Sequence, residues 1–291
     1  MANSLREVKL RIASTQSTAQ ITKAMHMVSQ SKVKKAEKNY KSYKDFMNRI
    51  ASMVTQIINK TSEDIAHPLL LEREVNKTAY LIITSDRGLA GPYNSSIYKM
   101  ITSLIEENHK SKDEFITAAI GKKGHGYLLK KGYPMLNSEA TFVRDDVMFV
   151  DIIPMAKSFI DLYLEKKIDK LVIVYNHYVN SLVQEVKIEE LLPIREIKGD
   201  DSNIDYSYEN GVEKTLDLIL PMYIQDMIYG IILDAKTAEH SARMNSMKNA
   251  TDNAEEVIEK LQLLYNRARQ NVVTNELIDI IGGANAIGGD E

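Results

Sequence analysis

Cysteine and tryptophan are both absent from the 291-residue sequence. A chain without cysteine forms no disulfide bond and no thiolate metal site, which fits a reducing compartment. The six histidines are scattered and show no paired metal-ligand spacing. No run of 18 or more apolar residues occurs, so the sequence predicts no membrane span. The N-terminus also lacks the apolar core and the small-residue cleavage site of a signal peptide.

Glycine and proline are missing from long stretches at both ends of the chain. Residues 1–87 contain no glycine and one proline, Pro68, while Met222–Ile281 contains no proline and one glycine, Gly230. Because these two residue types interrupt helices, their absence predicts two long helices. The first is expected from about Ser4 to about Asn59, and the second up to the glycines at 282–283. Pro221 is expected to kink or restart the second helix.

Both long segments carry apolar residues at alternating steps of three and four. The first series is Val33, Ala36, Tyr40, Tyr43, Met47, Ile50, Val54 and Ile57, and the second is Met247, Ala250, Ala254, Val257, Leu261, Leu264 and Ala268. The average step of 3.5 residues is the seam of a left-handed coiled coil. We therefore expect an intramolecular antiparallel coiled coil formed by residues 1–60 and 209–291. The alternative, an ordinary helical bundle, is disfavoured because bundles have short connections.

The middle of the chain has the pattern of a different domain. Thr78–Thr84, Phe115–Ile120 and Lys170–Asn176 read as buried strands that alternate with helices, and 186–192 reads as an antiparallel edge strand. Strand–helix alternation predicts a doubly wound, Rossmann-like α/β domain over residues 75–200. The fold class is therefore α/β, with a long antiparallel coiled coil of the terminal helices.

Charge is unevenly distributed, although the net charge is only −3. Residues 1–60 contain twelve Lys and Arg but only three acids, a local charge of +9. A helix of this kind favours an acidic partner. The motifs and aromatic interleaving of nucleic-acid-binding modules are missing, so no nucleic acid is expected. A solvated face balanced by acids on the C-terminal helix fits the same pattern.

Two glycine-containing loops follow predicted strands, where doubly wound sheets bind ligands. The loop Ser85–Gly91 and the segment Gly121–Gly126 match neither G-x-G-x-x-G nor G-x-x-x-x-G-K-[ST]. Tight strand-to-helix turns that need glycine explain both better than phosphate binding does. No catalytic triad, carboxylate pair or metal cluster can be assembled from the sequence. We expect no cofactor. We also expect a protein with a mechanical or scaffolding role in preference to an enzyme.

Three stretches together resemble one family. They are Ile21-Thr-Lys-Ala-Met-His-Met-Val28, Thr84-Ser-Asp-Arg-Gly-Leu-Ala-Gly91, and Ala242-Arg-Met-Asn-Ser-Met-Lys-Asn-Ala-Thr-Asp-Asn-Ala254 continuing through Leu261–Gln270 to Thr274–Leu277. The sequence resembles the gamma subunits of F-type ATP synthases over essentially its whole length. The terminal helices carry the most specific part of this resemblance.

The resemblance implies the central shaft of a rotary motor, with no catalytic residue of its own. The coiled coil would turn inside a ring of alpha and beta subunits, and the α/β body would rest on the epsilon subunit and the ring of c subunits. Rotation driven by protons would then change the conformations of the beta subunits and drive ATP synthesis, and hydrolysis would reverse it. The implied location is the cytoplasmic face of a bacterial membrane, as a peripheral protein.

The resemblance also implies which residues contact the alpha/beta ring. Lys23 and Met25 match family positions near the acidic lever segments of the beta subunits. Arg269, Gln270 and Thr274 match positions that engage the beta subunits nearer the tip, and Arg243 belongs to the signature of the same helix. All four C-terminal residues are expected on the exposed side of the helix. A role in helix packing or solubility is the alternative for each.

Two other functions remain open on sequence grounds. One is a coiled-coil adaptor with a ligand-binding α/β domain, and the other is a nucleotide-dependent enzyme. Both would use the loop Ser85–Gly91, so both predict that the isolated chain binds a small molecule there, whereas the shaft does not.

Overall fold

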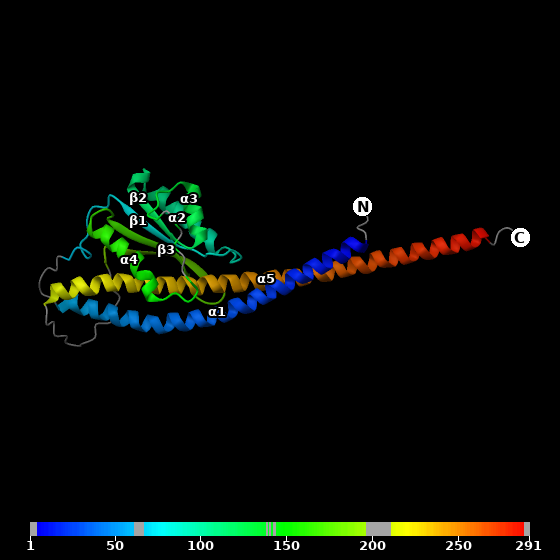
Figure 1. Ribbon diagram of the computed structural model, residues 1–291, viewed down its shortest axis with the longest axis horizontal. Coiled ribbons are helices and arrows are strands. Elements are labelled where there is room, and N and C mark those ends of the chain that lie inside the picture. Colours follow the sequence, from blue (N-terminus) through cyan, green and yellow to red (C-terminus); the bar gives the residue numbers. More distant parts are fainter. Residues whose placement is uncertain are drawn as a thin grey trace. The chain divides into compact units, whose positions relative to one another are not determined.

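The computed structural model describes residues 5–60, 67–137, 139, 141, 144–195 and 211–287. It contains five α-helices, one short 3-10 helix and a four-stranded sheet in these residues (Figure 1). The elements in chain order are α1 Leu5–Lys60, β1 Thr78–Ile83, α2 Tyr93–Asn108, η1 Lys112–Glu114, β2 Phe115–Ile120, α3 Lys122–Lys131, α4 Phe149–Leu164, β3 Lys170–Tyr178, β4 Gln184–Leu192 and α5 Val212–Ile287.

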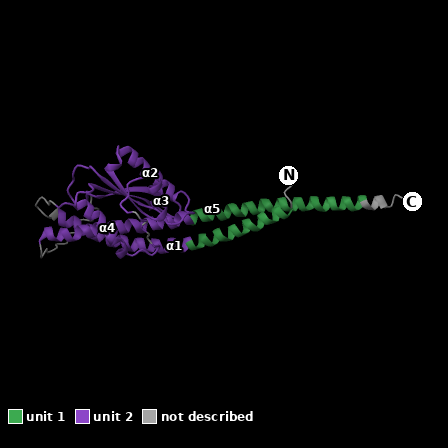
Figure 2. Cartoon of the chain, turned by 45° about the horizontal axis from the view of Figure 1, so that its top comes forward, with its two compact units in different colours: residues 1–28, 244–291 green, residues 29–243 purple. Residues whose placement is uncertain are grey.

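The chain divides into two compact units, coloured separately in Figure 2. Unit 1 consists of Met1–Val28 and Met244–Glu291, and unit 2 of Ser29–Arg243. Helices α1 and α5 each contribute to both units. The sheet and helices α2, α3 and α4 all belong to unit 2.

Unit 2 is built on a sheet with strand order β2-β1-β3-β4. Strand β1 pairs in parallel with β2 and β3, and β4 pairs antiparallel with β3 at the edge, as the sequence predicted. Strand β1 is buried on both faces, which is why it reads as a continuous apolar run.

Alternate residues of the strands pack into two separate hydrophobic cores, one on each face of the sheet. Tyr80, Ile82 and Val172 pack with α2 and α3 on one face of the sheet. Leu81, Ile83 and Ile173 pack on the other face with α4 and with the parts of α1 and α5 that belong to unit 2. The sheet is therefore covered by helices on both sides, which confirms the doubly wound α/β fold.

The seam predicted for the later part of α1 is confirmed. Its eight residues from Val33 to Ile57 are all buried or half-buried. At the middle of this seam, Tyr43 packs edge-on against Tyr229 of α5, with ring centroids 4.7 Å apart. The Tyr43 hydroxyl donates a hydrogen bond to Asp226 Oδ1 at 2.5 Å.

Unit 1 is a pair of antiparallel helices (Figure 2). Along α1 the less exposed residues are Leu5, Val8, Ile12, Thr15, Ala19, Thr22 and His26, again in steps of three and four. The buried Thr22 and Thr251 share a hydrogen bond between their hydroxyl oxygens at 2.8 Å. This contact joins α1 to α5 and fixes how the two helices are aligned.

The seam predicted on α5 has the right period but is partly out of phase. Met247 and Ala254 are buried, and Leu261 and Ala268 are half-buried, as expected. The predicted Val257 and Leu264 are 45% and 49% exposed. Ile258 and Tyr265 take their place as the half-buried residues. Residues seven apart lie on the same face of the helix. The seam residue between them can stand either three or four positions along, and both choices give an average step of 3.5 residues.

Of the two effects expected of Pro221, a kink or a restart of the C-terminal helix, the restart is wrong. Helix α5 begins at Val212 and continues through Pro221, and it runs past the glycines at 282–283 to Ile287. Leu216, Leu220 and Ile224 around the proline are almost fully buried. A proline removes one backbone hydrogen bond, and the burial of this apolar face offsets that loss.

Part of α5 is apolar enough to cross a membrane by length and composition. More than half of that stretch is buried inside the protein. It packs in the core of unit 2 with residues such as Ile228 and Ile232, so this apolar character is explained by the protein interior.

Candidate partner-binding residues on the long helices

The predicted contact residues on α1 differ in exposure. Lys23 is exposed, whereas Met25 is half-buried. Their neighbour Thr22 is buried in the helix pair, where its hydroxyl oxygen also lies 3.1 Å from the carbonyl oxygen of Ala19. Helix periodicity therefore directs Lys23 away from the seam and leaves Met25 at its margin.

The predicted contact residues near the end of α5 are all exposed. The Thr274 hydroxyl donates to the Gln270 carbonyl within the helix at 2.8 Å, whereas the side chains of Arg269 and Gln270 face solvent. From Arg269 to Gly282 every residue is exposed. We call this segment the terminal stretch.

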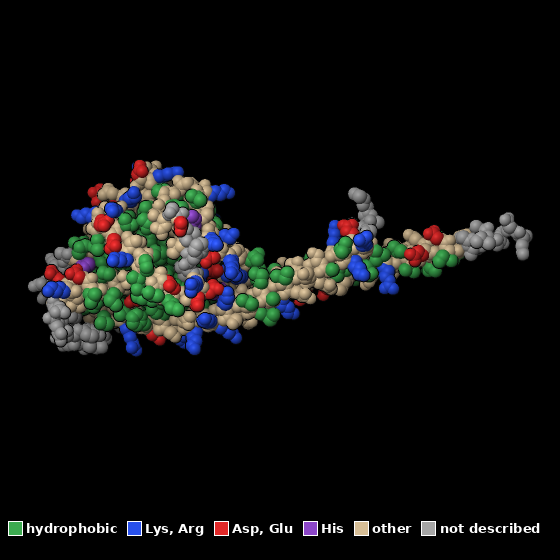
Figure 3. Space-filling view, in the orientation of Figure 1, with side chains coloured by type: hydrophobic (Ala, Val, Ile, Leu, Met, Phe, Trp, Pro, Cys, Tyr) green, Lys and Arg blue, Asp and Glu red, His purple; other side chains and the backbone are tan. Residues whose placement is uncertain are grey.

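The terminal stretch is unusually apolar for a solvated helix. Figure 3 shows hydrophobic and acidic side chains on the visible side of its C-terminal half. Its exposed large apolar residues are Val272, Val273, Leu277, Ile278, Ile280 and Ile281. Because an isolated helix gains little stability in water from its sequence alone, such a surface indicates a binding partner.

Arg243 does not lie on the exposed side of α5, so that part of the prediction is wrong. It is only 9% exposed and belongs to unit 2. Its guanidinium donates to Glu239 Oε1 at 2.8 Å and to the carbonyls of Arg87 and Gly88 at 3.3 and 3.4 Å. Arg243 therefore holds the loop that follows β1.

Arg243 ends a stretch of α5 that sequence reasoning missed. All thirteen residues from Ile231 to Arg243 are buried, so the helix is enclosed around its whole circumference. Helices enclosed in this way are normally apolar. Seven of these residues are polar or charged instead: Asp234, Lys236, Thr237, Glu239, His240, Ser241 and Arg243. We call Ile231–Arg243 the enclosed segment.

Asp234 and Ser241 of the enclosed segment bond to the end of β3 and to the turn that follows it. Asp234 accepts a hydrogen bond from the backbone N–H of Tyr178 at 2.9 Å and lies 2.5 Å from His177 Nδ1. Ser241 donates to the carbonyl of Ser181, in the β3–β4 turn, at 2.7 Å. A buried polar group costs free energy unless it is paired, and these partners satisfy that requirement.

Asp145 connects both long helices. Its carboxylate lies 2.5 Å from Lys32 Nζ of α1 and 3.4 Å from His240 Nε2 of α5. Burial raises the pKa of Asp145, but the hydrogen bond from Lys32 and the nearby positive charges outweigh this effect and leave the pKa below its ordinary value. Burial lowers the pKa of His240 to about 4, so the imidazole is neutral at pH 7.

The loop Ser85–Gly91 uses its polar groups within the protein. The backbone N–H groups of Lys122, Lys123 and Gly124, at the start of α3, donate to Asp86 Oδ1, the Ser85 carbonyl and Thr84 Oγ1 at 2.8–3.2 Å. A phosphate at this helix N-terminus would have to displace these bonds.

Close packing explains Gly121 and Gly124, but not Gly88 or Gly126, where a Cβ atom would meet nothing within 4 Å. A Cβ atom on Gly121, whose φ is +93°, would lie 2.2 Å from the carbonyl oxygen of Thr84. This geometry supports a tight structural turn.

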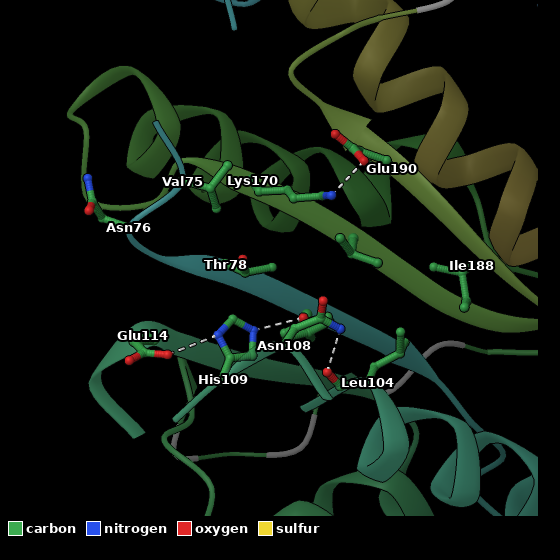
Figure 4. A pocket seen from close by; sticks show the side chains of 12 residues that line it. Val75, Asn76, Thr78, Leu104, Asn108, His109, Glu114, Lys170, Ile188 and Glu190 are labelled. Atoms are coloured by element: carbon green, nitrogen blue, oxygen red, sulfur yellow. Dashed lines mark hydrogen bonds and ion pairs between the residues drawn. The ribbon is translucent and has the colours of Figure 1, made fainter. Parts of the chain in front are cut away.

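A pocket of 710 Å³ lies at the opposite edge of the sheet, near the start of β1 and β3 (Figure 4). Its polar side chains pair with one another: Lys170 Nζ lies 2.7 Å from Glu190 Oε2, and the Tyr80 hydroxyl 2.9 Å from His109 Nε2. The pocket is remote from the Ser85–Gly91 loop, so it does not support the ligand site that the adaptor or enzyme would use. Among the described residues, no group of three or more His, Asp or Glu could hold a metal ion.

Comparison with known proteins identifies the family. The ATP synthase family model (ATP-synt) matches residues 4–287. An ATP synthase gamma chain from Exiguobacterium sp. (strain ATCC BAA-1283 / AT1b) is 43% identical over 284 residues, which cover 98% of this chain and 99% of that protein. The chain belongs to the gamma chain family of ATP synthases. As a gamma chain it is a central-stalk subunit of a membrane-associated complex, and it is not itself catalytic.

Chains in solved structures of mitochondrial ATP synthases share the fold of this gamma chain. A chain in the central stalk/c-ring structure of the Tetrahymena thermophila mitochondrial ATP synthase is 24% identical, with a TM-score of 0.59. The match covers 79% of this gamma chain and 99% of that chain. A chain in the Euglena gracilis mitochondrial ATP synthase structure (OSCP/F1/c-ring, rotational state 3) is 18% identical, with a TM-score of 0.65 and coverage of 97% and 94%.

Proposed function

We propose that this gamma chain is the rotor of an F-type ATP synthase. In this proposal the coiled coil of residues 1–60 and 209–291 turns inside the ring of alpha and beta subunits. The α/β domain of residues 75–200 contacts the epsilon subunit and the c ring. Turning of the c ring by protons turns the chain, and each orientation stabilises a different set of beta conformations.

The observation that carries this proposal is the terminal stretch of α5. It exposes six large apolar residues on a helix that belongs to the gamma chain family. A surrounding protein sleeve would bury these residues and keep the stretch helical. The related solved structures are of F1 with the c-ring and of the rotor of mitochondrial ATP synthases, which is consistent with such surroundings.

We assign the contacts with the alpha/beta ring to Lys23, Met25, Arg269, Gln270 and Thr274, with Arg243 acting from its buried position. The exposed side chains of Lys23, Arg269 and Gln270 are free to meet acidic or amide groups of a partner. Met25 contributes apolar contact at the margin of the helix pair. Arg243 acts through the Arg87–Gly88 loop that it holds.

The location that follows is the cytoplasmic face of a bacterial membrane, reached through the complex. The high identity to a bacterial gamma chain supports this location. Gentle purification of the tagged chain from the cell membrane fraction tests both the location and the partners. The expected result is an ATPase complex that contains alpha, beta, epsilon and c subunits. A chain that purifies alone under these conditions would refute the proposal.

The proposed contacts are tested by Arg269→Ala and Gln270→Ala in the assembled complex. Both residues are exposed, so the melting temperature of the free chain should stay unchanged while the ATPase rate and rotation of the complex fall. Asn266→Ala, an exposed position one turn earlier, is the matched control and should leave both readouts unchanged. Equal activity in all three variants would remove these residues from the interface.

A further inference from the structure

The enclosed segment of α5 presents its polar side chains in several directions. At about 100° per residue, Asp234 and Ser241 share one face, His240 lies roughly 120° around the helix, and Arg243 points to the opposite side. The side chains that point in these directions contact different parts of unit 2. The segment is therefore held from several sides at once.

Four ties can be named by their partners. Asp234 bonds to the end of β3, and Ser241 to the β3–β4 turn. Nε2 of His240 contacts Asp145 Oδ1 at 3.4 Å, and Arg243 bonds to the loop after β1. The hydrophobic effect is non-directional, so apolar packing fixes the rotation of a helix about its axis less specifically than hydrogen bonds do. Directional bonds on different faces oppose such a turn because every one of them would have to stretch or break.

The helix that carries these ties continues directly from unit 2 into unit 1. We propose that the enclosed segment is the torsional key of the chain, the place where α5 is locked to the α/β body so that torque passes between the body and the coiled coil. This inference rests on the proposed rotor function. In it Asp145, His240 and Ser241 are positioning residues, which act by holding α5 and not by touching a partner subunit.

Asp145 extends the key to the second long helix. Its carboxylate accepts a hydrogen bond from Lys32 of α1 and lies 3.4 Å from Nε2 of His240 in α5. A turn of either helix within the body would break one of these contacts. The key therefore holds both helices of the shaft against the same loop.

The test measures the twisting stiffness of the rotor in the intact complex. The chain has no cysteine, so Lys99→Cys at an exposed position of α2 supplies its only thiol for a bead on the α/β body. With the alpha/beta ring immobilised and stalled, the angular fluctuation of the bead reports torsional stiffness. Asp145→Ala with Ser241→Ala removes two of the four ties and should lower the stiffness by roughly half if the ties act independently.

Ile232→Val is the matched control. This residue lies in the same segment and is fully buried, but it packs in the apolar core and makes no tie. It should lower the melting temperature of the chain and leave the stiffness unchanged. Ser241→Ala alone, with a smaller expected loss, replaces the double variant if the latter does not assemble.

The outcomes separate the two claims. Rotation of the bead on the otherwise unaltered Lys99→Cys complex during ATP hydrolysis establishes the rotor function, and its failure would refute the proposed function. If that complex rotates and the tie variants are as stiff as Ile232→Val, the torsional key is refuted. A stiffness loss in the tie variants alone supports it.

Discussion

Thr22 and Thr251 are separated by 228 residues in the sequence and joined by one hydrogen bond, with their hydroxyl oxygens 2.8 Å apart. The carbonyls of Ala19 and Met247 also lie within hydrogen-bond distance, at 3.1 Å from Thr22 Oγ1 and 2.9 Å from Thr251 Oγ1. Because each hydroxyl has one hydrogen, one threonine donates across the helix pair and the other donates to the carbonyl of its own helix. Both side chains are buried. The pair is therefore a polar marker inside the coiled coil, of the kind that fixes how two helices align.

The first prediction concerns this pair. Thr22→Val removes the partner of the Thr251 hydroxyl across the helix pair, while the Met247 carbonyl remains within reach, and should lower the free energy of unfolding by about 1 kcal/mol. Thr251→Val should behave alike, and the double variant should cost less than the sum because both polar groups are then gone. Denaturant unfolding followed by circular dichroism checks this. Strict additivity would show that the two hydroxyls do not interact.

The second prediction compares two glycines at the start and middle of α3. Gly121→Ala should destabilise the chain by roughly 2 kcal/mol or more, because the new Cβ meets the Thr84 carbonyl and the backbone has a positive φ. Gly126→Ala meets no atom within 4 Å and should be neutral or stabilising by up to about 1 kcal/mol. Thermal melts of the two variants measure this difference in stability. A stable Gly121→Ala chain would contradict the tight turn.

The third prediction concerns Arg73, which precedes β1. Its guanidinium bonds Asp169 and the carbonyls of Tyr163 and Ile168, and it lies 4.1 Å from the centre of the Tyr163 ring. A lysine offers neither the planar fork nor the stacking, so Arg73→Lys should cost about 2 kcal/mol of stability.

Arg11 provides the control for this substitution. It forms an exposed pair with Glu7 on α1, at 2.8 Å. Arg11→Lys should change the free energy of unfolding by less than about 0.5 kcal/mol. Equal losses for the two variants would mean that the Arg73 network carries no special stability.

The fourth prediction concerns pH. The pKa of His240 is lowered from 6.5 to about 4 by burial, so between these values the unfolded chain binds a proton that the folded chain does not. The contribution of His240 to the free energy of unfolding is therefore complete above pH 6.5. It falls by roughly 3 kcal/mol as the pH drops toward 4.

His240→Gln should remove much of this slope. His67 and His109 have pKa values that burial also lowers, so they add slope of the same sign in both proteins. Burial raises the pKa values of Asp226 and Asp234, which gives slope of the opposite sign in both proteins. Chemical unfolding at a series of pH values between 4 and 7 measures the difference. An unchanged slope in the variant would exclude His240 as a source of the pH dependence.

Much of the architecture could be predicted from the sequence because it follows from simple periodicity. The steps of three and four from Val33 to Ile57 identified the buried side of α1. The continuous apolar runs of β1 and β3 identified the interior strands. Here local pattern and tertiary burial agree, so each could be inferred from the other.

The enclosed segment could not be predicted in the same way. Asp234, Glu239 and Arg243 read as surface residues, since charged side chains are rarely buried unless they are paired. Their partners, such as His177 and Gly88, lie far away in the sequence and only the fold brings them together. One signal was available: polar residues occupy all sides of α5 there, which an amphipathic surface helix would not show.

The terminal stretch also bears on how the complex is assembled. A free gamma chain displays Val272, Leu277, Ile280 and their neighbours to water, which is a surface prone to self-association. Chains made in excess of the alpha and beta subunits should therefore aggregate or be degraded, while chains made together with them remain soluble. Balanced synthesis of the subunits is thus a requirement built into the end of α5.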